Sequence, residues 1–232
     1  MWFFYDYYYL VLVMPMIVFS LIAQYKVNST FNKYSKINTL RAQTGYDSAR
    51  MILDKNGLYD VKIERVRGHL SDHYDPRTNT VRLSDSVYGG TSVAAVGVAA
   101  HEAGHAVQYA TGYYPIKLRA AVIPMTNIGS YLSIPLIIIG LLFTGGITLA
   151  YIGVALFSLT AVFQLITLPV EFNASRRAIS ALRESYRFEE REINGAKSVL
   201  TAAAMTYVAA LAVALAQLLR LVLIVGGGSR RR

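Results

Sequence analysis

Long apolar stretches alternate with charged ones along the chain. About 20 consecutive apolar residues suffice for a helix to cross the hydrocarbon layer of a membrane, because each residue adds 1.5 Å. Four stretches meet this condition, and short aromatic and glycine-rich flanks bound them. We predict transmembrane helices over residues 1–23, about 121–143, about 147–168 and about 199–225, with residues 144–146 as the turn of a hairpin formed by residues 120–168.

The polar segments between these stretches predict one small hydrophilic domain, residues 24–119, and a helical segment, residues 169–198. In the domain we expect helices over residues 29–43, 45–55 and 92–110, and strands over residues 58–67 and 80–84. Thr44 is the expected N-cap of the second helix and Gly57 its end, and residues 75–79 read as a turn. The fold class is therefore a mainly α, polytopic membrane protein with a small α+β domain and a tail over residues 226–232.

Composition supports this division. Hydrophobic residues make up 54% of the chain, more than is usual for a soluble domain. No cysteine is present, which excludes disulfides and cysteine-ligated metals. The net charge of +9 would suit nucleic acid or anionic lipid as a partner. The chain has no aromatic-basic recognition pattern, so we expect the lipid bilayer and no nucleic acid.

The distribution of Lys and Arg predicts the topology. Of the 23 basic residues, 13 lie between Lys26 and Arg119 and 6 between Arg176 and Lys197. Four spans place these two segments on one side of the membrane, which the positive-inside rule makes the cytoplasm. The three C-terminal arginines would then lie outside, against the same rule. The first stretch has no positive n-region and no clear cleavage site, so we interpret it as a retained anchor.

An HExxH motif lies on the last predicted helix of the hydrophilic domain, with His101, Glu102 and His105 as its defining residues. Residues four apart share one face of a helix, so both imidazoles can bind one zinc ion. Glu102 is one step round the helix and is placed to act as the general base on a water. The alternative is two surface histidines beside an ordinary glutamate. That alternative requires polar neighbours, whereas residues 98–100 and 106–107 are all Ala or Val.

A catalytic zinc ion needs a third protein ligand and an open position. No histidine follows His105, and Glu171 is the first acidic residue after Glu102. The predicted hairpin returns the chain to the side of the membrane where His101 lies, which favours Glu171 as the third ligand. The alternative is a solvated carboxylate at a membrane boundary.

These motifs resemble those of a known family. HExxH, two spans and a glutamate that opens a helix are similar to membrane gluzincins of the HtpX and CAAX-prenyl-protease type. His73-Tyr74-Asp75-Pro76, residues 81–84, 99–108 and 168–175 resemble more closely the YugP-type neutral zinc metallopeptidases of bacteria. The resemblance implies a zincin-like domain, a multi-pass protein of the bacterial plasma membrane and Glu171 as zinc ligand.

The resemblance is incomplete beside the predicted zinc site. Gluzincins usually carry an aspartate four residues after the ligand glutamate, where it orients a zinc-bound histidine. This chain has Ser175 there. Ser175 or Asn173 could accept the histidine N–H instead, as a neutral and weaker partner.

Other residues have less specific interpretations. The strand over residues 80–84 is either an edge strand that pairs with an extended substrate or an inner strand of a small sheet. His73 and Tyr74 could stabilise an oxyanion, although a local structural contact is commoner for a turn histidine. Arg176 and Arg177 are expected to face headgroups or solvent. Arg220 is expected to extend towards the membrane surface.

The sequence thus predicts a zinc metalloendopeptidase that cleaves membrane or membrane-proximal proteins on the cytoplasmic side. One catalytic zinc ion would be bound by His101, His105 and Glu171, with Glu102 as general base. The alternatives are a non-proteolytic scaffold that binds zinc and a hydrolase of a non-peptide amide or ester. Small residues over 140–153 and 202–216 permit close helix packing, with no particular oligomeric state indicated.

Overall fold

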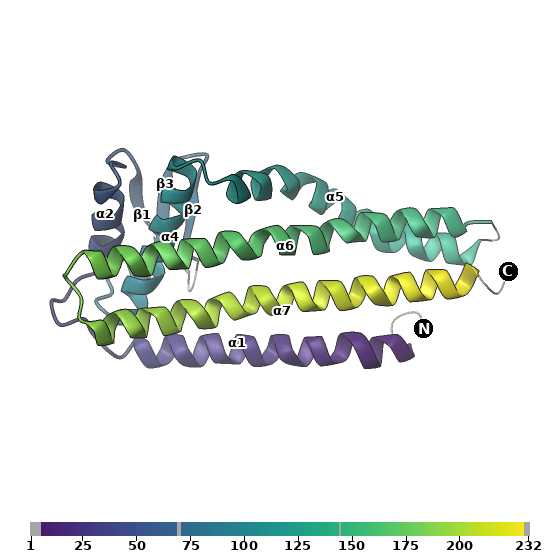
Figure 1. Ribbon diagram of the computed structural model, residues 1–232, viewed down its shortest axis with the longest axis horizontal. Coiled ribbons are helices and arrows are strands. Elements are labelled where there is room, and N and C mark those ends of the chain that lie inside the picture. The colour runs from purple at the N-terminus through teal and green to yellow at the C-terminus, as the bar shows by residue number, and fades with distance from the viewer. Residues whose placement is uncertain (1–5, 69–70, 144, 230–232) are drawn as a thin grey trace. The chain divides into compact units, whose positions relative to one another are not determined.

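The structure is a computed structural model that describes residues 6–68, 71–143 and 145–229 (Figure 1). It divides into two compact units. The first unit comprises Met1–Ala23, Leu118–Leu168 and Thr206–Arg232, and the second comprises Gln24–Lys117 and Pro169–Met205. The predicted turn residue 144 and the three C-terminal arginines lie outside the described residues.

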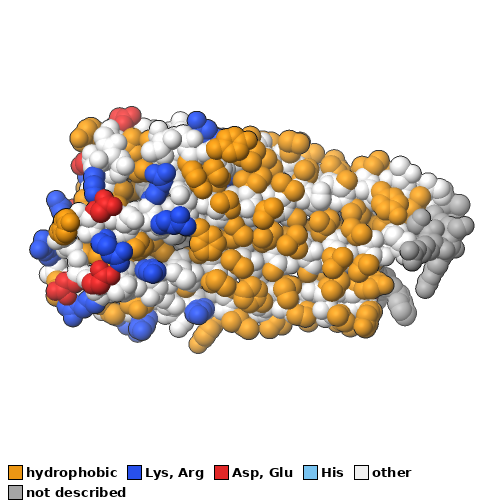
Figure 2. All heavy atoms as spheres, in the orientation of Figure 1, with side chains coloured by type: hydrophobic (Ala, Val, Ile, Leu, Met, Phe, Trp, Pro, Cys, Tyr) orange, Lys and Arg blue, Asp and Glu red, His pale blue; other side chains and the backbone are white. Residues whose placement is uncertain are grey.

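Among the described residues, four helices are long and apolar enough to cross a membrane, as predicted: Tyr9–Tyr34, Tyr114–Leu142, Ile147–Glu184 and Glu190–Gly227. They correspond to a π-helical start η1 (Tyr9–Val13) with α1 (Met14–Tyr34), and to α5 (Tyr114–Leu142), α6 (Ile147–Glu184) and α7 (Glu190–Ser229). Each helix is longer than its apolar stretch and continues into polar residues, and α6 does so through Pro169, which lies inside the helix. The visible surface of the first unit is mainly hydrophobic, whereas Lys and Arg gather on that of the second (Figure 2).

Arg220 corrects one of the predictions within the first unit. Its guanidinium lies 2.6 Å from a carboxylate oxygen of Asp6, and its side chain is only 3% exposed. The same group lies over the ring of Tyr9, 5.4 Å from the centroid. A charged group among apolar helices is costly unless it is paired, and here the partner comes from the N-terminal segment. The prediction that Arg220 extends to the membrane surface is therefore wrong.

The second unit contains the hydrophilic elements. These are α2 (Gly45–Lys55), β1 (Lys62–Val66), β2 (His73–Asp75), β3 (Thr80–Ser84), α3 (Asp85–Tyr88) and α4 (Val93–Ala110). Thr44 caps α2 through a reciprocal capping box with Asp47, and Gly57 follows the helix with φ of +72°. Ser92 caps α4 by accepting the backbone N–H of Ala95. Local chemistry thus defines both ends of α2 as predicted, and it defines the start of α4.

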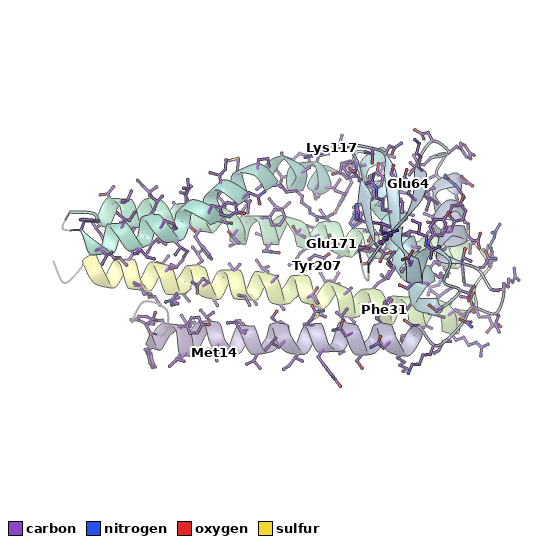
Figure 3. The ribbon with its side chains drawn as sticks, turned by 180° about the vertical axis from the view of Figure 1, so that it is seen from behind. Met14, Phe31, Glu64, Lys117, Glu171 and Tyr207 are labelled. Atoms are coloured by element: carbon purple, nitrogen blue, oxygen red, sulfur yellow. The ribbon has the colours of Figure 1, made fainter. Side chains whose placement is uncertain are left out.

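The predicted helix over residues 29–43 is wrong beyond Tyr34, where α1 ends. Phe31, which Figure 3 labels, lies near this end and packs in a small cluster with Ala94 and Val199. The chain then turns, Asn38 forms an isolated β-bridge with Ser92, and the carbonyl of Ile37 accepts the N–H of Val93 at 2.8 Å. Residues far away in the sequence therefore form hydrogen bonds with backbone groups that would bond within the helix if it were longer.

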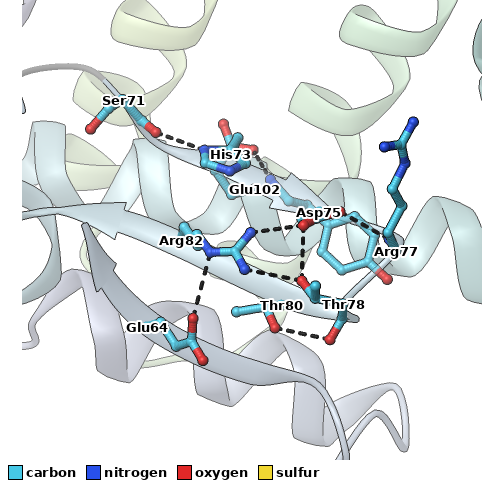
Figure 4. A network of polar contacts seen from close by, with 10 residues as sticks. Glu64, Ser71, His73, Asp75, Arg77, Thr78, Thr80, Arg82 and Glu102 are labelled. Atoms are coloured by element: carbon cyan, nitrogen blue, oxygen red, sulfur yellow. Dashed lines mark hydrogen bonds and ion pairs between the residues drawn. The ribbon is translucent and has the colours of Figure 1, made fainter. Parts of the chain in front are cut away.

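The sheet has the order β1-β3-β2, with β1 parallel and β2 antiparallel to β3. The strand at 80–84 is therefore central, which decides between its two interpretations in favour of an inner strand of a small sheet. β2 was not predicted because three residues are too few to show an alternating pattern. Arg82 of β3 links both neighbours: its guanidinium lies 2.8 Å from Asp75 and 3.5 Å from Glu64 (Figure 4). This contact holds the pKa of Asp75 well below its usual range.

Helix α4 packs closely against α6 and α7 within this unit, as its Ala- and Gly-rich sequence predicts. A β-carbon on Gly104 would lie 2.8 Å from the carbonyl oxygen of Ala174 on α6, and one on Gly97 would lie 3.2 Å from Ala196 on α7. The helices can approach this closely only because these positions carry no side chain. The contact at Gly104 places the HExxH segment beside the start of the polar part of α6.

We expect Gly104→Ala to destabilise the protein by about 1–3 kcal/mol and to weaken metal binding, because the added methyl group pushes α6 away from α4. Thermal unfolding and zinc content of the purified protein would measure both effects. Gly89→Ala is the matched control, since a β-carbon there meets nothing within 4 Å. Equal stability of the two variants would contradict the close packing.

Candidate metal centre

Helix α4 presents two histidines on one face. His101 and His105 are four residues apart, and their ring centroids lie 4.7 Å apart with the planes at 82°. Their side chains are 15% and 12% exposed, so they are not surface histidines. The apolar neighbours that the sequence shows around the motif are buried in the core of the second unit, as Ala99, Ala100 and Ala103 illustrate.

Glu171 reaches the same point from α6, two residues after the proline inside that helix (Figure 3). Its Oε2 lies 3.3 Å from Nε2 of His101 and 3.6 Å from Nε2 of His105. The Glu171 side chain is 3% exposed. The three donor atoms lie within 4.8 Å of one another, so the group could hold a metal ion. The structure thus brings together all three predicted ligands. Glu171 lies 66 residues after His105 and 70 residues after His101 in the sequence.

These residues fit zinc by donor type and spacing. Two imidazole nitrogens and a carboxylate oxygen are a common protein ligand set of catalytic zinc, which leaves one position for water or substrate. Donors on a tetrahedral zinc ion at about 2.0–2.1 Å lie about 3.3 Å apart. The distances of 3.3 and 3.6 Å from Glu171 to the two histidines agree with that spacing.

The electrostatics of the site also favour a cation. Burial by itself lowers the pKa of His105, but the contact with Glu171 and the charges of Glu102 and Glu171 raise it by more. The pKa of His105 therefore lies above its ordinary value. Two carboxylates in a largely buried site attract positive charge, as a bound metal ion would supply.

The other nitrogen of each imidazole is held by a neutral partner. His101 Nδ1 lies 3.1 Å from the Ser175 hydroxyl, and His105 Nδ1 lies 3.0 Å from Oε1 of Gln108. The Gln108 amide donates to the carbonyl of Val170, so its oxygen must face His105. With a metal ion bound, His105 would therefore carry its proton on Nδ1 and direct the Nε2 lone pair at the ion. Such contacts orient metal-binding histidines and set their tautomer.

Ser175 is therefore one of the two histidine partners that the sequence suggested, and Asn173 is not. The side-chain oxygen of Asn173 instead accepts from Gln108 at 3.0 Å and from Arg177 at 2.8 Å. Gln108, which is fully buried, was missed by the sequence analysis. Its spacing of three residues from His105 on one helix is the signal that would have identified it.

Glu102 lies beside the ligand group without belonging to it. Its Oε2 accepts the backbone N–H of Tyr74 on β2 at 3.1 Å (Figure 4). The strand that the sequence did not predict thus holds the carboxylate that the sequence assigned as general base. Among the described residues, Oε1 of Glu102 has no hydrogen-bond partner and remains available to a water or substrate.

His73 and Tyr74 make local contacts through their side chains. Nδ1 of His73 lies 2.8 Å from the carbonyl oxygen of Ser71, and the residue is exposed. The Tyr74 hydroxyl donates to Asn79 at 2.8 Å. These contacts agree with the structural interpretation of His73 and give neither side chain an oxyanion role. The fourth histidine, at position 69, lies outside the described residues.

We expect Ser175→Ala to lower zinc affinity by about 10- to 100-fold, the usual effect of removing a partner that orients a metal-binding histidine. Ser175→Asp should restore or raise the affinity, because a carboxylate accepts the His101 N–H more strongly. Competition with a chromophoric zinc chelator would measure these changes. Ser198→Ala, which removes an exposed hydroxyl bonded to its own helix, is the control. Wild-type affinity in Ser175→Ala would show that Ser175 does not support His101.

Comparisons with known proteins identify the family. Residues 9–226 match the family model described as "putative neutral zinc metallopeptidase". The chain is 50% identical over 202 residues to a protein of Bacillus subtilis (strain 168) named "putative membrane protease YugP". This alignment covers 87% of the chain and 89% of that protein. No solved structure matches the chain. The match over nearly the whole length confirms the resemblance seen in the motifs: this membrane protein belongs to the neutral zinc metallopeptidase family.

Proposed function

We propose that the protein is a zinc endopeptidase that cleaves membrane or membrane-proximal proteins, with His101, His105 and Glu171 as zinc ligands and Glu102 as general base. The convergence of the three donor atoms beside Glu102 is the observation that carries the proposal. A zinc ion used only for structure normally has four protein ligands. A set of three with a carboxylate next to it supports catalysis over a scaffold role.

Each residue of the site has a separate task in peptide hydrolysis. Bound zinc supplies Lewis-acid chemistry, which polarises the scissile carbonyl and makes water nucleophilic near neutral pH. Glu102 accepts the proton of the attacking water on its unpaired oxygen and passes it to the leaving amine. The N–H of Tyr74 fixes the other oxygen and so keeps the carboxylate aimed at the site. Ser175 and Gln108 keep both imidazoles in the required orientation.

The position of Glu171 supports substrates at the membrane surface. It follows Leu168, the end of the predicted third span, by three residues, which is about 4.5 Å along a helix. Peptide segments that leave the bilayer would therefore pass close to the site. Reconstituted full-length protein should cleave a peptide joined to a transmembrane anchor faster than the same peptide in solution. Mass spectrometry of the products would identify the cut bond, and equal rates would contradict a membrane-surface substrate.

We also propose that the site faces the cytoplasm of a bacterial cell, since 19 of the 23 basic residues lie on its side of the predicted topology. Reporter fusions after Arg119 and Lys197 should both show a cytoplasmic location, and a fusion at the C-terminus an external one. A cytoplasmic C-terminus would mean that the number of spans is not four.

A further inference from the structure

A groove on the second unit collects basic side chains from two helices. It has a volume of about 360 Å³ and lies between α6 and α7. Arg176 and Arg183 line it from α6 and Lys197 from α7, with the hydroxyls of Ser180 and Thr201 between them. None of the described residues that line the groove is acidic. Its polar groups can therefore all donate hydrogen bonds to an anion.

Two of the three basic groups are not neutralised by the protein. Arg183 forms an ion pair with Glu190 at 2.8 Å. Within the part of the chain that the structure describes, Arg176 and Lys197 make no ion pair. The groove therefore keeps about two positive charges in a concave surface, where they reinforce each other towards a bound anion.

The predicted spans place the groove near the lipid headgroups. Lys197 precedes Val199, the start of the predicted fourth span, by two residues, and Arg176 follows Leu168 by eight. Eight residues of helix measure about 12 Å, a few Å beyond an interfacial layer about 5–8 Å deep. The long side chain of Arg176 can span this difference, because helical side chains lean towards the N-terminus of their helix, here the side of the predicted third span. Leu200 and Ile179 add apolar contacts to the lining. Basic grooves between spans at this depth bind the phosphate of anionic lipids.

We propose that this groove binds the phosphate group of an anionic phospholipid, with Arg176 and Lys197 as its charged contacts and the hydroxyls as additional donors. Arg177, the neighbour of Arg176, is not part of the site, because it contacts Asn173 and lies 6.0 Å from the ring centroid of Tyr113. Arg176 therefore lines the groove, whereas Arg177 contacts residues outside it.

The groove is distinct from the face on which a peptide bond would have to bind. Ser175 lines the groove, and its hydroxyl contacts Nδ1 of His101. The opposite ring nitrogen, Nε2, faces Glu171. A bound headgroup therefore lies behind His101, away from the donor atoms of the metal site. The lipid site does not depend on the proposed peptidase activity.

Native mass spectrometry of the full-length protein in an equal mixture of phosphatidylglycerol and phosphatidylcholine with identical acyl chains tests the proposal. Wild-type protein should retain phosphatidylglycerol in preference to phosphatidylcholine. Arg176→Gln/Lys197→Gln should reduce that preference on the order of 30-fold, which corresponds to about 1 kcal/mol for each basic residue. Both positions are exposed, so the variant should fold, and its thermal midpoint in pure phosphatidylcholine checks this.

Arg187→Gln/Arg191→Gln is the matched control, because it removes the same charge from exposed positions near the α6–α7 turn that do not line the groove. This variant should retain the wild-type preference. Equal losses in both variants would overturn the site in favour of a general charge effect. An undiminished preference in the groove variant would overturn it as well. If inorganic phosphate displaces the lipid completely at equal concentration, the groove is a site for soluble phosphate and the lipid assignment is wrong.

Discussion

Glu102→Gln is expected to stop peptide hydrolysis and to leave zinc binding intact. Glutamine has nearly the same shape, and its side-chain oxygen can still accept the N–H of Tyr74 that holds Glu102 at 3.1 Å. The amide cannot accept a proton from water at neutral pH. Loss of a general base costs about 10²- to 10⁴-fold in rate, so the cleavage of a membrane-anchored substrate should fall by at least that range.

Zinc content, measured on the same preparation as the cleavage rate, separates a loss of chemistry from a loss of metal. Glu64→Gln makes the same change on β1, where the carboxylate is half exposed and outside the metal site. That control should cleave at the wild-type rate. Unchanged cleavage by Glu102→Gln with zinc bound would exclude Glu102 as general base.

Glu171→Gln is expected to release the metal itself. The carboxylate is buried and faces Nε2 of both histidines at 3.3 and 3.6 Å, so it is the only negative ligand in the group. A neutral amide is a poor ligand for zinc, and two imidazoles alone leave the site incomplete. Partners that only orient a ligand contribute about 10- to 100-fold to metal affinity. Loss of the carboxylate ligand should exceed about 100-fold.

Equilibrium dialysis against buffered zinc would measure this loss. Glu184→Gln is the control on the same helix, where the exposed carboxylate pairs with Lys55. It should bind zinc as the wild type does. If Glu171→Gln retained wild-type affinity, the third ligand would have to be another group, although the fold of the site would stand.

The four spans, both ends of α2 and the start of α4 could be predicted because short stretches of sequence determine them. Hydropathy over about 20 residues identifies a span, and Thr44, Gly57 and Ser92 act on residues within one helical turn. The end of α1 could not be predicted in this way. The backbone of Ile37 bonds with Val93, and Glu192 accepts the N–H of Leu40 across 152 residues.

The same distinction applies to the metal centre. His101 and His105 form a local pattern, and Glu171 could be inferred because few acidic residues were available. β2 left no trace in the sequence pattern, and it supplies the N–H that holds Glu102. The place of Gln108 depends on how closely α4 approaches α6, which Gly104 permits. Tertiary packing, rather than local propensity, determines this part of the site.

Zinc-dependent cleavage by the reconstituted full-length protein tests the proposed function most directly. A chelator should remove the metal and the activity together, and zinc added back should restore the cleavage of a membrane-anchored peptide in proportion to site occupancy. Activity should reach its maximum at one zinc ion per chain, and Glu102→Gln should bind that zinc without cleaving. Cleavage that persists in the fully zinc-free protein would contradict the assignment of His101, His105 and Glu171 as a catalytic zinc site.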